Sequence, residues 1–174
     1  MATITVNTTG SQPHIYLTTN TAIGNLYTGA SSSTWTSTED ALDVTCLQDI
    51  TVNNSTGIFS WVDFCTTDMN KVTTPADNSI STNIVIDPDG FFGNVALTGA
   101  ELAGVNGLSS SKTYVQWVLV MNGNLATPTV GAYWYRGLGY ITSVSPTVSP
   151  DSPVWVSPME IAVSGDMTTG VVAS

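Results

Sequence analysis

The chain has 174 residues, and charged residues make up only 9% of them, against about 25% in typical soluble domains. The formal net charge is −10, because 13 acidic residues stand against only three basic ones, Lys71, Lys112 and Arg136. So few cations argue against proteins that bind the phosphates of nucleic acids and against docking on anionic membranes.

The length favours one domain over residues 1–174. No run of about 18 apolar residues is present, so no membrane-spanning helix is expected. The first ten residues, MATITVNTTG, lack a basic and an apolar segment; we therefore expect no signal peptide, and folding in a cytoplasm. In that compartment Cys46 and Cys65 are expected to be free, buried thiols, with a disulfide between them as the alternative.

Alternation of apolar and polar residues dominates the chain and predicts strands. The alternating runs of the first half are residues 2–6, 14–18, 41–49, 57–65 and 81–87. Those of the second half are residues 113–121, 130–137, 139–145 and 154–164. The run 113–121 is nearly all apolar, which predicts a central strand covered on both faces. Breaks rich in Gly, Pro and Asn separate the runs, so the expected fold class is mainly β, a β-sandwich or barrel.

One short α-helix is predicted at about residues 99–106. Thr98 and Glu101 form a T-x-x-E capping box before it. The segment also carries a hydrophobic staple pair and a glycine suited to the C′ position, namely Leu97, Leu102 and Gly107. Because the helix is short, tertiary packing must hold it.

Two segments are rich in polar and turn-forming residues and predict loose order: residues 28–40 and residues 66–79. The second belongs to a longer region, about residues 48–79, which we expect to form a long loop.

The sequence offers little chemistry. His14 is the only histidine, so a catalytic triad or a metal site would lack its usual residues, and a structural or exposed role is expected. Residues 87–90, DPDG, resemble the start of a calcium loop, but Phe92 and Thr98 occupy the positions where an EF-hand has Gly and Glu. A plain turn is therefore expected there. We predict no enzyme, no cofactor and no metal site.

The aromatic run Tyr133, Trp134 and Tyr135 could suggest a sugar-binding platform. Consecutive strand residues point to opposite faces, so the three cannot form one flat surface. Core packing or a subunit interface is the preferred interpretation.

The stretch RGLGYITSVSPTVSPDSPVWVSPMEIAVSGDMTTG, residues 136–170, resembles the C-terminal hairpin of tail tube (major tail) proteins of long-tailed, siphovirus-like bacteriophages. The matching pieces are Ile141-Thr142-Ser143, the Pro150-Asp151 turn, Glu160 to Val163, and Gly165 to Gly170. Upstream, ALDVTCLQD resembles an acidic strand of that family. STNIVIDPDG resembles the strand that precedes its helix. The resemblance touches about half of the chain.

This resemblance implies a β-sandwich with one helix whose subunits form hexameric rings. The rings stack into a tube through which DNA leaves the capsid. Two hairpins per subunit join across neighbours into an inner barrel, and a long loop reaches the adjacent ring. The implied partners are further copies of the chain and the tape-measure, tail-terminator and tail-tip proteins. The implied location is the virion tail, after assembly in the host cytoplasm. Loops of the family often carry Lys or Arg, whereas residues 48–79 carry only Lys71.

The composition agrees with a conduit, because every cation that pairs with a phosphate would add affinity for DNA. Strand edges without Lys also suit a chain that pairs its edges with neighbours. Counting alternate residues along three strands gives four candidate lumen-facing acids: Asp43, Asp87, Glu160 and Asp166. Pro158 is expected at a bulge or facing away from the ladder.

Two alternatives remain open at this point. The acids could face solvent on an ordinary sandwich. The chain could also be an Ig-like decoration or carbohydrate-binding module of a virion or fibre.

Overall fold

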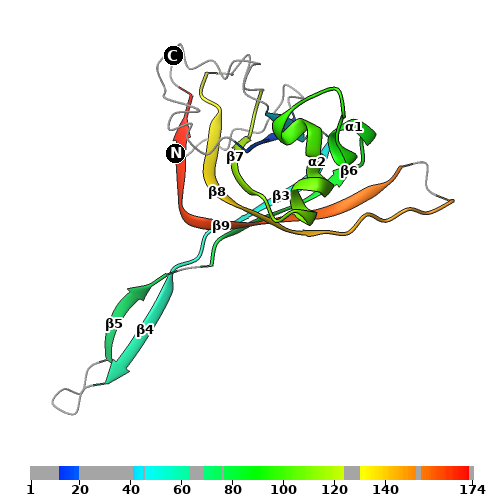
Figure 1. Ribbon diagram of the computed structural model, residues 1–174. Coiled ribbons are helices and arrows are strands. Elements are labelled where there is room, and N and C mark those ends of the chain that lie inside the picture. The colour runs from blue at the N-terminus through cyan, green and yellow to red at the C-terminus, as the bar shows by residue number, and fades with distance from the viewer. Residues whose placement is uncertain are drawn as a thin grey trace.

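The structure is a computed structural model (Figure 1), and it describes residues 12–19, 41–44, 46–62, 69–75, 77–123, 130–151 and 154–172. The strands are β1 (His14–Thr18), β2 (Leu42–Val44), β3 (Leu47–Asn53), β4 (Gly57–Val62), β5 (Met69–Thr74), β6 (Ser79–Val85), β7 (Tyr114–Val120), β8 (Tyr133–Val144) and β9 (Val156–Val171). The helices are α1 (Pro88–Phe92) and α2 (Gly99–Ser110). The mainly β class predicted from alternation is confirmed.

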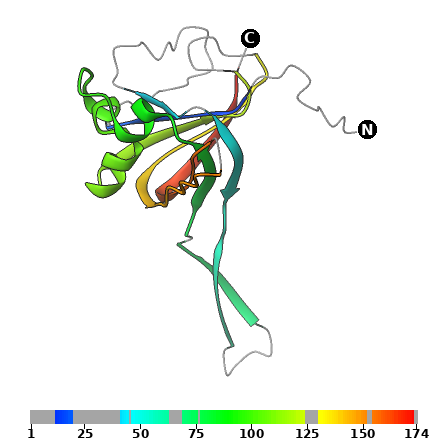
Figure 2. The ribbon, with the colours of Figure 1, turned by 90° about the vertical axis from the view of Figure 1, so that its right-hand side faces the viewer.

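Seven strands form one sheet in the order β2-β1-β7-β8-β9-β6-β3. Every pair of neighbours is antiparallel. The sheet curls, and both helices lie on one of its faces (Figures 1 and 2). As predicted, β7 lies inside the sheet and is buried from Val115 to Val120.

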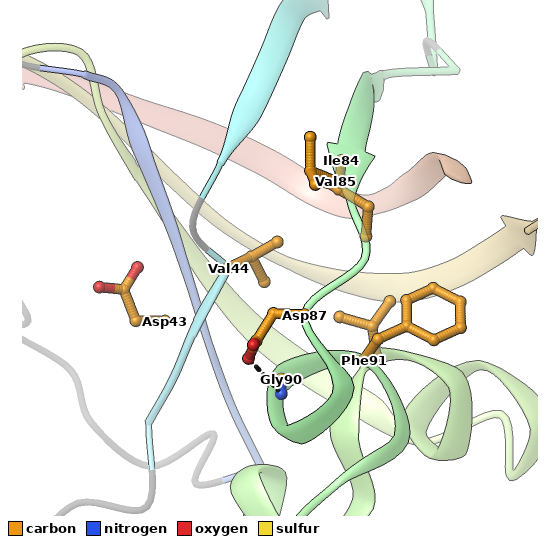
Figure 3. A pocket seen from close by; sticks show the side chains of 8 residues that line it. Asp43, Val44, Ile84, Val85, Asp87, Gly90 and Phe91 are labelled. Atoms are coloured by element: carbon orange, nitrogen blue, oxygen red, sulfur yellow. Dashed lines mark hydrogen bonds between the residues drawn. The ribbon is translucent and has the colours of Figure 1, made fainter. Parts of the chain in front are cut away.

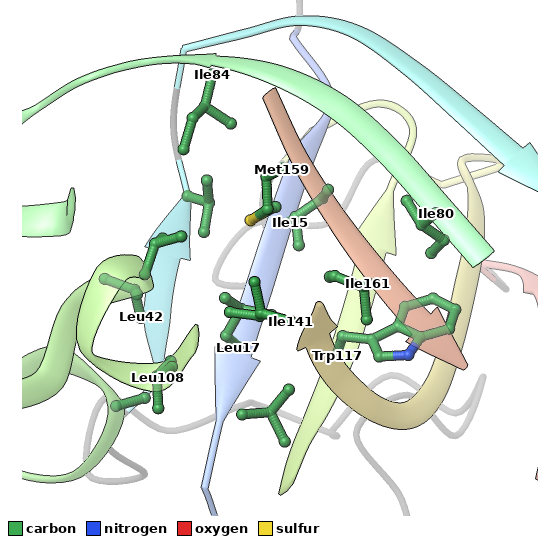
Figure 4. Packing of buried hydrophobic residues seen from close by; sticks show 14 of the residues in the cluster. Ile15, Leu17, Leu42, Ile80, Ile84, Leu108, Trp117, Ile141, Met159 and Ile161 are labelled. Carbon is green, nitrogen blue, oxygen red and sulfur yellow. The ribbon is translucent and has the colours of Figure 1, made fainter. Parts of the chain in front are cut away.

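The main core fills the space between the curled sheet and the helices (Figure 4). Alternate residues of the strands supply it: Ile15 and Leu17 from β1, Ile80 and Ile84 from β6, and Met159 and Ile161 from β9. Phe91, Ala100, Val105 and Leu108 supply it from the helices. A second, smaller cluster that includes Val118 and Trp134 is separate from it.

The runs 130–137 and 139–145, predicted as two strands, join into the single strand β8. The glycines within β8 do not interrupt the strand. They lie where atoms of neighbouring residues come close to its backbone. A Cβ at Gly137 would stand 2.7 Å from the ring of Trp117, and a Cβ at Gly139 would collide with the carbonyl oxygen of Ala162. These positions need glycine because neighbouring atoms occupy the space of a side chain.

Pro158 lies inside β9, paired with Asn83 of β6, and not at the bulge that was one expectation for it. Its carbonyl oxygen accepts a hydrogen bond from the backbone N–H of Ser145 on the β8 side. In an antiparallel ladder the N–H and C=O of one residue point to the same neighbour. Pro158 therefore lacks a hydrogen-bond donor only toward β8. That strand ends at Val144, so no ladder hydrogen bond is lost there.

The predicted strand 41–49 is wrong as one element, because it divides into β2 and β3 around Cys46. Cys46 has φ +60°, in the left-handed region that turns the chain sharply. The turn carries the chain from one outer strand of the sheet to the other. Cys46 is free, but it is exposed, so the expected burial of this thiol is wrong.

The predicted helix 99–106 exists and continues to Ser110, because Gly107 stays helical and does not end it. Thr98 is the N-cap, but its side chain makes no capping hydrogen bond, so the capping box is wrong. Gly99 has φ +59°, which turns the chain away from the geometry that such a box needs. Gly104, with φ +64°, kinks the helix.

Residues 87–90 form the start of α1 and not a plain turn. The Asp87 carboxylate accepts a hydrogen bond from the N–H of Gly90 (3.0 Å), and Pro88 occupies the first turn. An Asp N-cap followed by Pro is a helix-start signal, and the calcium-loop comparison obscured it.

The region 48–79 is mostly strand, not the loop that we expected. β4 and β5 pair from Gly57↔Thr74 to Val62↔Met69 and project from the body as a hairpin, here called the arm (Figures 1 and 2). Its base is held by hydrogen bonds from Ser55 to the side chain of Asn78 (3.0 Å) and to the carbonyl of Asp77 (3.1 Å).

No helix among the described residues has the length and apolar character to cross a bilayer. Several predictions fall outside the described residues: the strand 2–6, the loose segment 28–40, and the state of Cys65.

Candidate functional site

Strands β3, β6, β9 and the end of β8 present one polar face, on the side opposite the core. We call it the polar sheet face and define it by Asp49, Thr51, Ser81, Asn83, Ser143, Pro158 and Glu160, which line one open depression. Along β6, Ser81 is exposed whereas Ile80, Thr82 and Ile84 are buried. The period of two thus separates a core face from a polar one.

Glu160 lies at the middle of the polar sheet face and is exposed. It pairs with Ser81 of β6 on one side and with Ser143 of β8 on the other. A bulge in β8 next to this row leaves Thr142 unpaired, and its hydroxyl donates to the carbonyl of Glu160 (3.3 Å). Of the four acids predicted from sequence, Glu160 is the one on this face.

Asp49 of β3 is a second carboxylate on the polar sheet face, and the sequence reasoning missed it. It accepts hydrogen bonds from the backbone N–H and the side-chain amide of Asn83, each 2.8 Å. The residue was inside a predicted strand, but that strand was expected to end at residue 49. Counting alternate residues from Asp43 reaches Asp49, but only the pairing of β3 with β6 shows that it faces Asn83.

Asp43 lies on β2, at the other end of the sheet from β3. Its carboxylate pairs with His14 Nδ1 of β1 at 3.0 and 3.2 Å. The ring of His14 stacks on Tyr16, with centroids 5.9 Å apart. Asp43 is thus part of a local pair between β1 and β2, away from Glu160.

Asp87 follows the end of β6 and caps α1. It lines a small pocket between β2, β6 and α1 (Figure 3). Asp43 lines the same pocket, but the other lining residues are mostly apolar, among them Val44, Ile84 and Phe91. The oxygens of Asp87 face the N–H of Gly90, so this acid holds a helix start.

Asp166 is exposed, but β9 changes register before it. Leu138 pairs with Ser164 and Arg136 pairs with Thr168, so residues 165–167 face a single residue of β8. Gly165 has φ +86° at this bulge. The bulge adds two residues to β9, so the alternation keeps its phase across it: Val163 and Met167 both pack against the main core, and Asp166 between them is exposed.

None of the three basic residues is among those that define the polar sheet face, although Arg136 of β8 lies on the same side of the sheet, opposite the main core, in a row with Val118 and Thr168. Lys71 is in β5, Lys112 follows α2, and the guanidinium of Arg136 lies 5.9 Å from the ring centroid of Trp134. The face therefore carries carboxylates and hydroxyls without a cation of its own chain.

Among the described residues, no further strand covers the two outer edges of the four strands that present the polar sheet face. β3 is the last strand of the sheet. At the other side, the pairing of β7 with β8 stops at Tyr140, so Ile141–Val144 extend beyond it. Unpaired edges are templates for pairing with another chain.

The arm exposes large apolar side chains on both of its faces: Ile58, Phe59, Trp61, Met69 and Val72. The rings of Phe59 and Trp61 stack, with centroids 5.9 Å apart. An isolated two-stranded hairpin is marginally stable in water. The two strands of the arm form a separate sheet, so no further strand in the part of the chain that the structure describes covers these side chains.

The aromatic run of β8 forms no platform, as its alternation predicted. Tyr133 is 64% exposed, whereas Trp134 is 6% exposed and belongs to the second cluster. Among the residues that the structure describes, no group of three or more His, Cys, Asp or Glu side chains could hold a metal ion.

No protein-family model matches the chain. No curated protein matches it in sequence. Among solved structures it is similar to the tail tube of SPP1, determined by solid-state NMR and cryo-EM, with a TM-score of 0.53 and 12% identity over 95% of this chain and 80% of that chain. It is also similar to the cap that terminates the tube of the anti-feeding prophage, with a TM-score of 0.50 and 10% identity over 98% and 95% of the two chains. The tail-tube type of fold predicted from sequence is confirmed.

Proposed function

We propose that this chain is a structural virion protein, a single domain that polymerises as stacked hexameric rings into a phage tail tube. The observation that carries the proposal is the polar sheet face with an open edge on each side. The fold shared with the SPP1 tail tube supports it.

Edge pairing between copies is the proposed mechanism of ring formation. β3 of one copy adds to Ile141–Val144 of the next, so that the strands around the polar sheet face continue from copy to copy. Closing the ring removes all of these edges and buries their unpaired N–H and C=O groups. The apolar side remains covered by the helices, and the polar sheet face then lines the lumen.

The lumen so formed has Asp49 and Glu160 on its wall, and no basic residue is among those that define the polar sheet face. DNA can pass without counterion-releasing contacts that would hold it. Asp43, Asp87 and Asp166 were predicted for the same surface. The contacts of Asp43 and Asp87 favour other roles for these two acids, whereas Asp166, exposed within the bulge of β9, remains a proposed lumen residue.

The arm is proposed to reach a subunit of the adjacent ring, where its apolar side chains become covered. At the ends of the tube, the tape-measure, tail-terminator and tail-tip proteins are the proposed partners. The chain is proposed to assemble in the host cytoplasm, to reside in the virion tail and to have no enzymatic role.

A disulfide trap tests the ring. Thr51, Ser81, Glu160 and Ser143 share one row across four strands. Three strand spacings separate Thr51 from Ser143, about 14 Å, which is too far for a disulfide within one copy. In a background with Cys46→Ser and Cys65→Ser, the double variant Thr51→Cys/Ser143→Cys should give covalent multimers up to the hexamer under oxidation.

The two single-cysteine variants are the controls, and they should stop at dimers. Tubes seen by negative-stain microscopy, combined with only monomers on a denaturing gel, would reject the edge pairing. A strictly monomeric chain by light scattering at high concentration, without tubes after virion partners are added, would reject the tail-tube role itself.

A further inference from the structure

An exposed apolar patch lies where α1 meets α2. Phe92, Val95, Leu97 and Leu102 form this helix-end patch, with 56%, 93%, 42% and 47% of their surfaces exposed. Backbone hydrogen bonds hold its segments together, from the N–H of Asn94 to the carbonyl of Glu101 and from the N–H of Leu97 to the carbonyl of Asn94, each 3.0 Å. These bonds fix the backbone that carries the four exposed side chains.

The segment that carries the helix-end patch also carries acidic residues, here called its acidic rim. The only charged residues between positions 87 and 111 are Asp87, Asp89 and Glu101. Asp89 lies in the first turn of α1, and Glu101 in the first turn of α2. The carboxylate of Asp87 is engaged in capping α1, which leaves Asp89 and Glu101 as the acids available to an incoming cation.

One face of the arm has the complementary character. The pairing of β4 with β5 puts Ile58, Ser60, Met69, Lys71 and Thr73 on the same face. Ile58 and Met69 are 59% and 60% exposed. Lys71 is the only charged residue within Gly57–Val62 and Met69–Thr74. A single cation between two apolar side chains matches an apolar patch bordered by two acids.

We propose that the Lys71 face of the arm docks on the helix-end patch of another copy, with Lys71 between Asp89 and Glu101. The arm projects from one end of the body and the helices lie toward the other (Figures 1 and 2). Two different surfaces at opposite ends give a head-to-tail contact. Such a contact leaves an arm and a patch free at the two ends of any stack, so it repeats without closing.

This inference rests on the proposed tube and adds the surface that receives the arm. The opposite face of the arm, with Phe59, Trp61 and Val72, is left for other contacts. The matched tests below therefore compare the two faces of the same hairpin.

Photo-cross-linking locates the contact. A benzophenone amino acid in place of Ile58 should cross-link to residues 92–102 of a second copy in assembled tubes, as read by mass spectrometry of isotopically mixed subunits. The same probe in place of Phe59, on the opposite face, should not label those residues. Tubes in which the Ile58 probe labels only other segments would overturn the docking and leave the tail-tube role standing.

Charge reversal tests the rim. Lys71→Glu should raise the critical concentration for tube formation about tenfold, because it sets like charges against each other at a contact. Asp89→Lys/Glu101→Lys should do the same, and the combination of all three changes should restore most of the loss. Lys112→Glu makes the same change of charge beyond the far end of α2 and should leave the critical concentration unchanged.

The outcomes separate the two proposals. Equal effects of Lys71→Glu and Lys112→Glu, with no rescue by the reversed acids, would overturn the docking alone. A wild-type chain that forms neither rings nor tubes would overturn the proposed function and the docking with it.

Discussion

Ser81 and Glu160 face each other across β6 and β9 in the middle of the polar sheet face. Ser143 continues the row on β8, so the carboxylate has hydroxyl groups on both sides. None of the chain's three basic residues is among those that define this face. A carboxylate in this setting can be exchanged for a cation without disturbing the core behind it, because its side chain is exposed.

The first prediction concerns Glu160→Lys. Folding and tube assembly should remain largely intact, but each subunit would place a cation in the proposed lumen. DNA ejection should slow, most strongly at low salt, since the added phosphate contacts release counterions. The measurement is ejection kinetics of particles that carry the variant. Asp151→Lys, the same charge change in the exposed β8–β9 turn, is the control. Equal ejection rates for wild type and Glu160→Lys at low salt would contradict the assignment.

The second prediction concerns the arm. Backbone amides of β4 and β5 should exchange quickly with solvent in the free subunit, because the hairpin contacts the body mainly at its base. Assembly should slow their exchange strongly, whereas the buried strand β7 should be protected in both states. Hydrogen exchange with mass spectrometry gives both values. Full protection of the arm in the free subunit would be inconsistent with an unpartnered hairpin.

The third prediction compares two leucines of α2. Leu108 is 1% exposed in the main core, and Leu102 is 47% exposed in the helix-end patch. Leu108→Ala should lower the free energy of unfolding of the free subunit by about 2–5 kcal/mol. Leu102→Ala should change it by about 0.5 kcal/mol or less, yet weaken tube formation. Denaturant unfolding and the critical concentration measure the two effects, and a similar stability loss for both variants would contradict the patch.

The fourth prediction concerns the close approach of Gly137 to Trp117. The Cβ of Gly137→Ala would stand 2.7 Å from the Trp117 ring, which is fully buried and has no room to shift. The free energy of unfolding should fall by about 1–3 kcal/mol. Gly90→Ala is the control, since its Cβ meets only an Asp87 oxygen at 3.4 Å and alanine favours a helix. A thermal midpoint unchanged by Gly137→Ala would show that the contact relaxes.

The fifth prediction concerns the thiols. Two free thiols should react under denaturant, because Cys46 and Cys65 are expected to stay reduced. Cys46 is exposed and should also react in the folded chain. Titration with a chromogenic disulfide reagent, with Cys46→Ser as the reference, counts both. A count of zero under denaturant would disprove the reduced state.

Sequence reasoning placed most strands because burial in this fold follows a period of two. Ile15 and Leu17, or Ile80 and Ile84, are buried as the alternation of their segments predicts. It failed where a single backbone angle redirects the chain. The positive φ of Cys46 divides one alternating run into β2 and β3, and that of Gly104 kinks α2. Cysteine rarely adopts a positive φ, and glycine does so at only some of its positions, so the residue type alone does not locate either angle.

The candidate site was predictable in part for the same reason. Glu160 was found because its strand keeps its alternation from Met159 to Val163, with Met159 and Ile161 buried. The bulge at 165–167, which contains Asp166, depends on the partner strand, and a local pattern cannot reveal it. The sequence around Asp87 fits a strand and a helix N-cap equally well, and only the position of α1 decides between them.

The exposed arm also affects how fast growth of the proposed tube starts. A free subunit offers a hairpin whose apolar faces have no cover, so two free subunits that meet must order both the hairpin and the contact at once. A subunit that meets a finished ring finds the receiving surfaces already arranged around the axis. Under the proposed stacking, starting a tube is therefore slow and lengthening one is fast. Under the same proposal, the subunit accumulates in solution and polymerises where a completed tail tip provides the first ring.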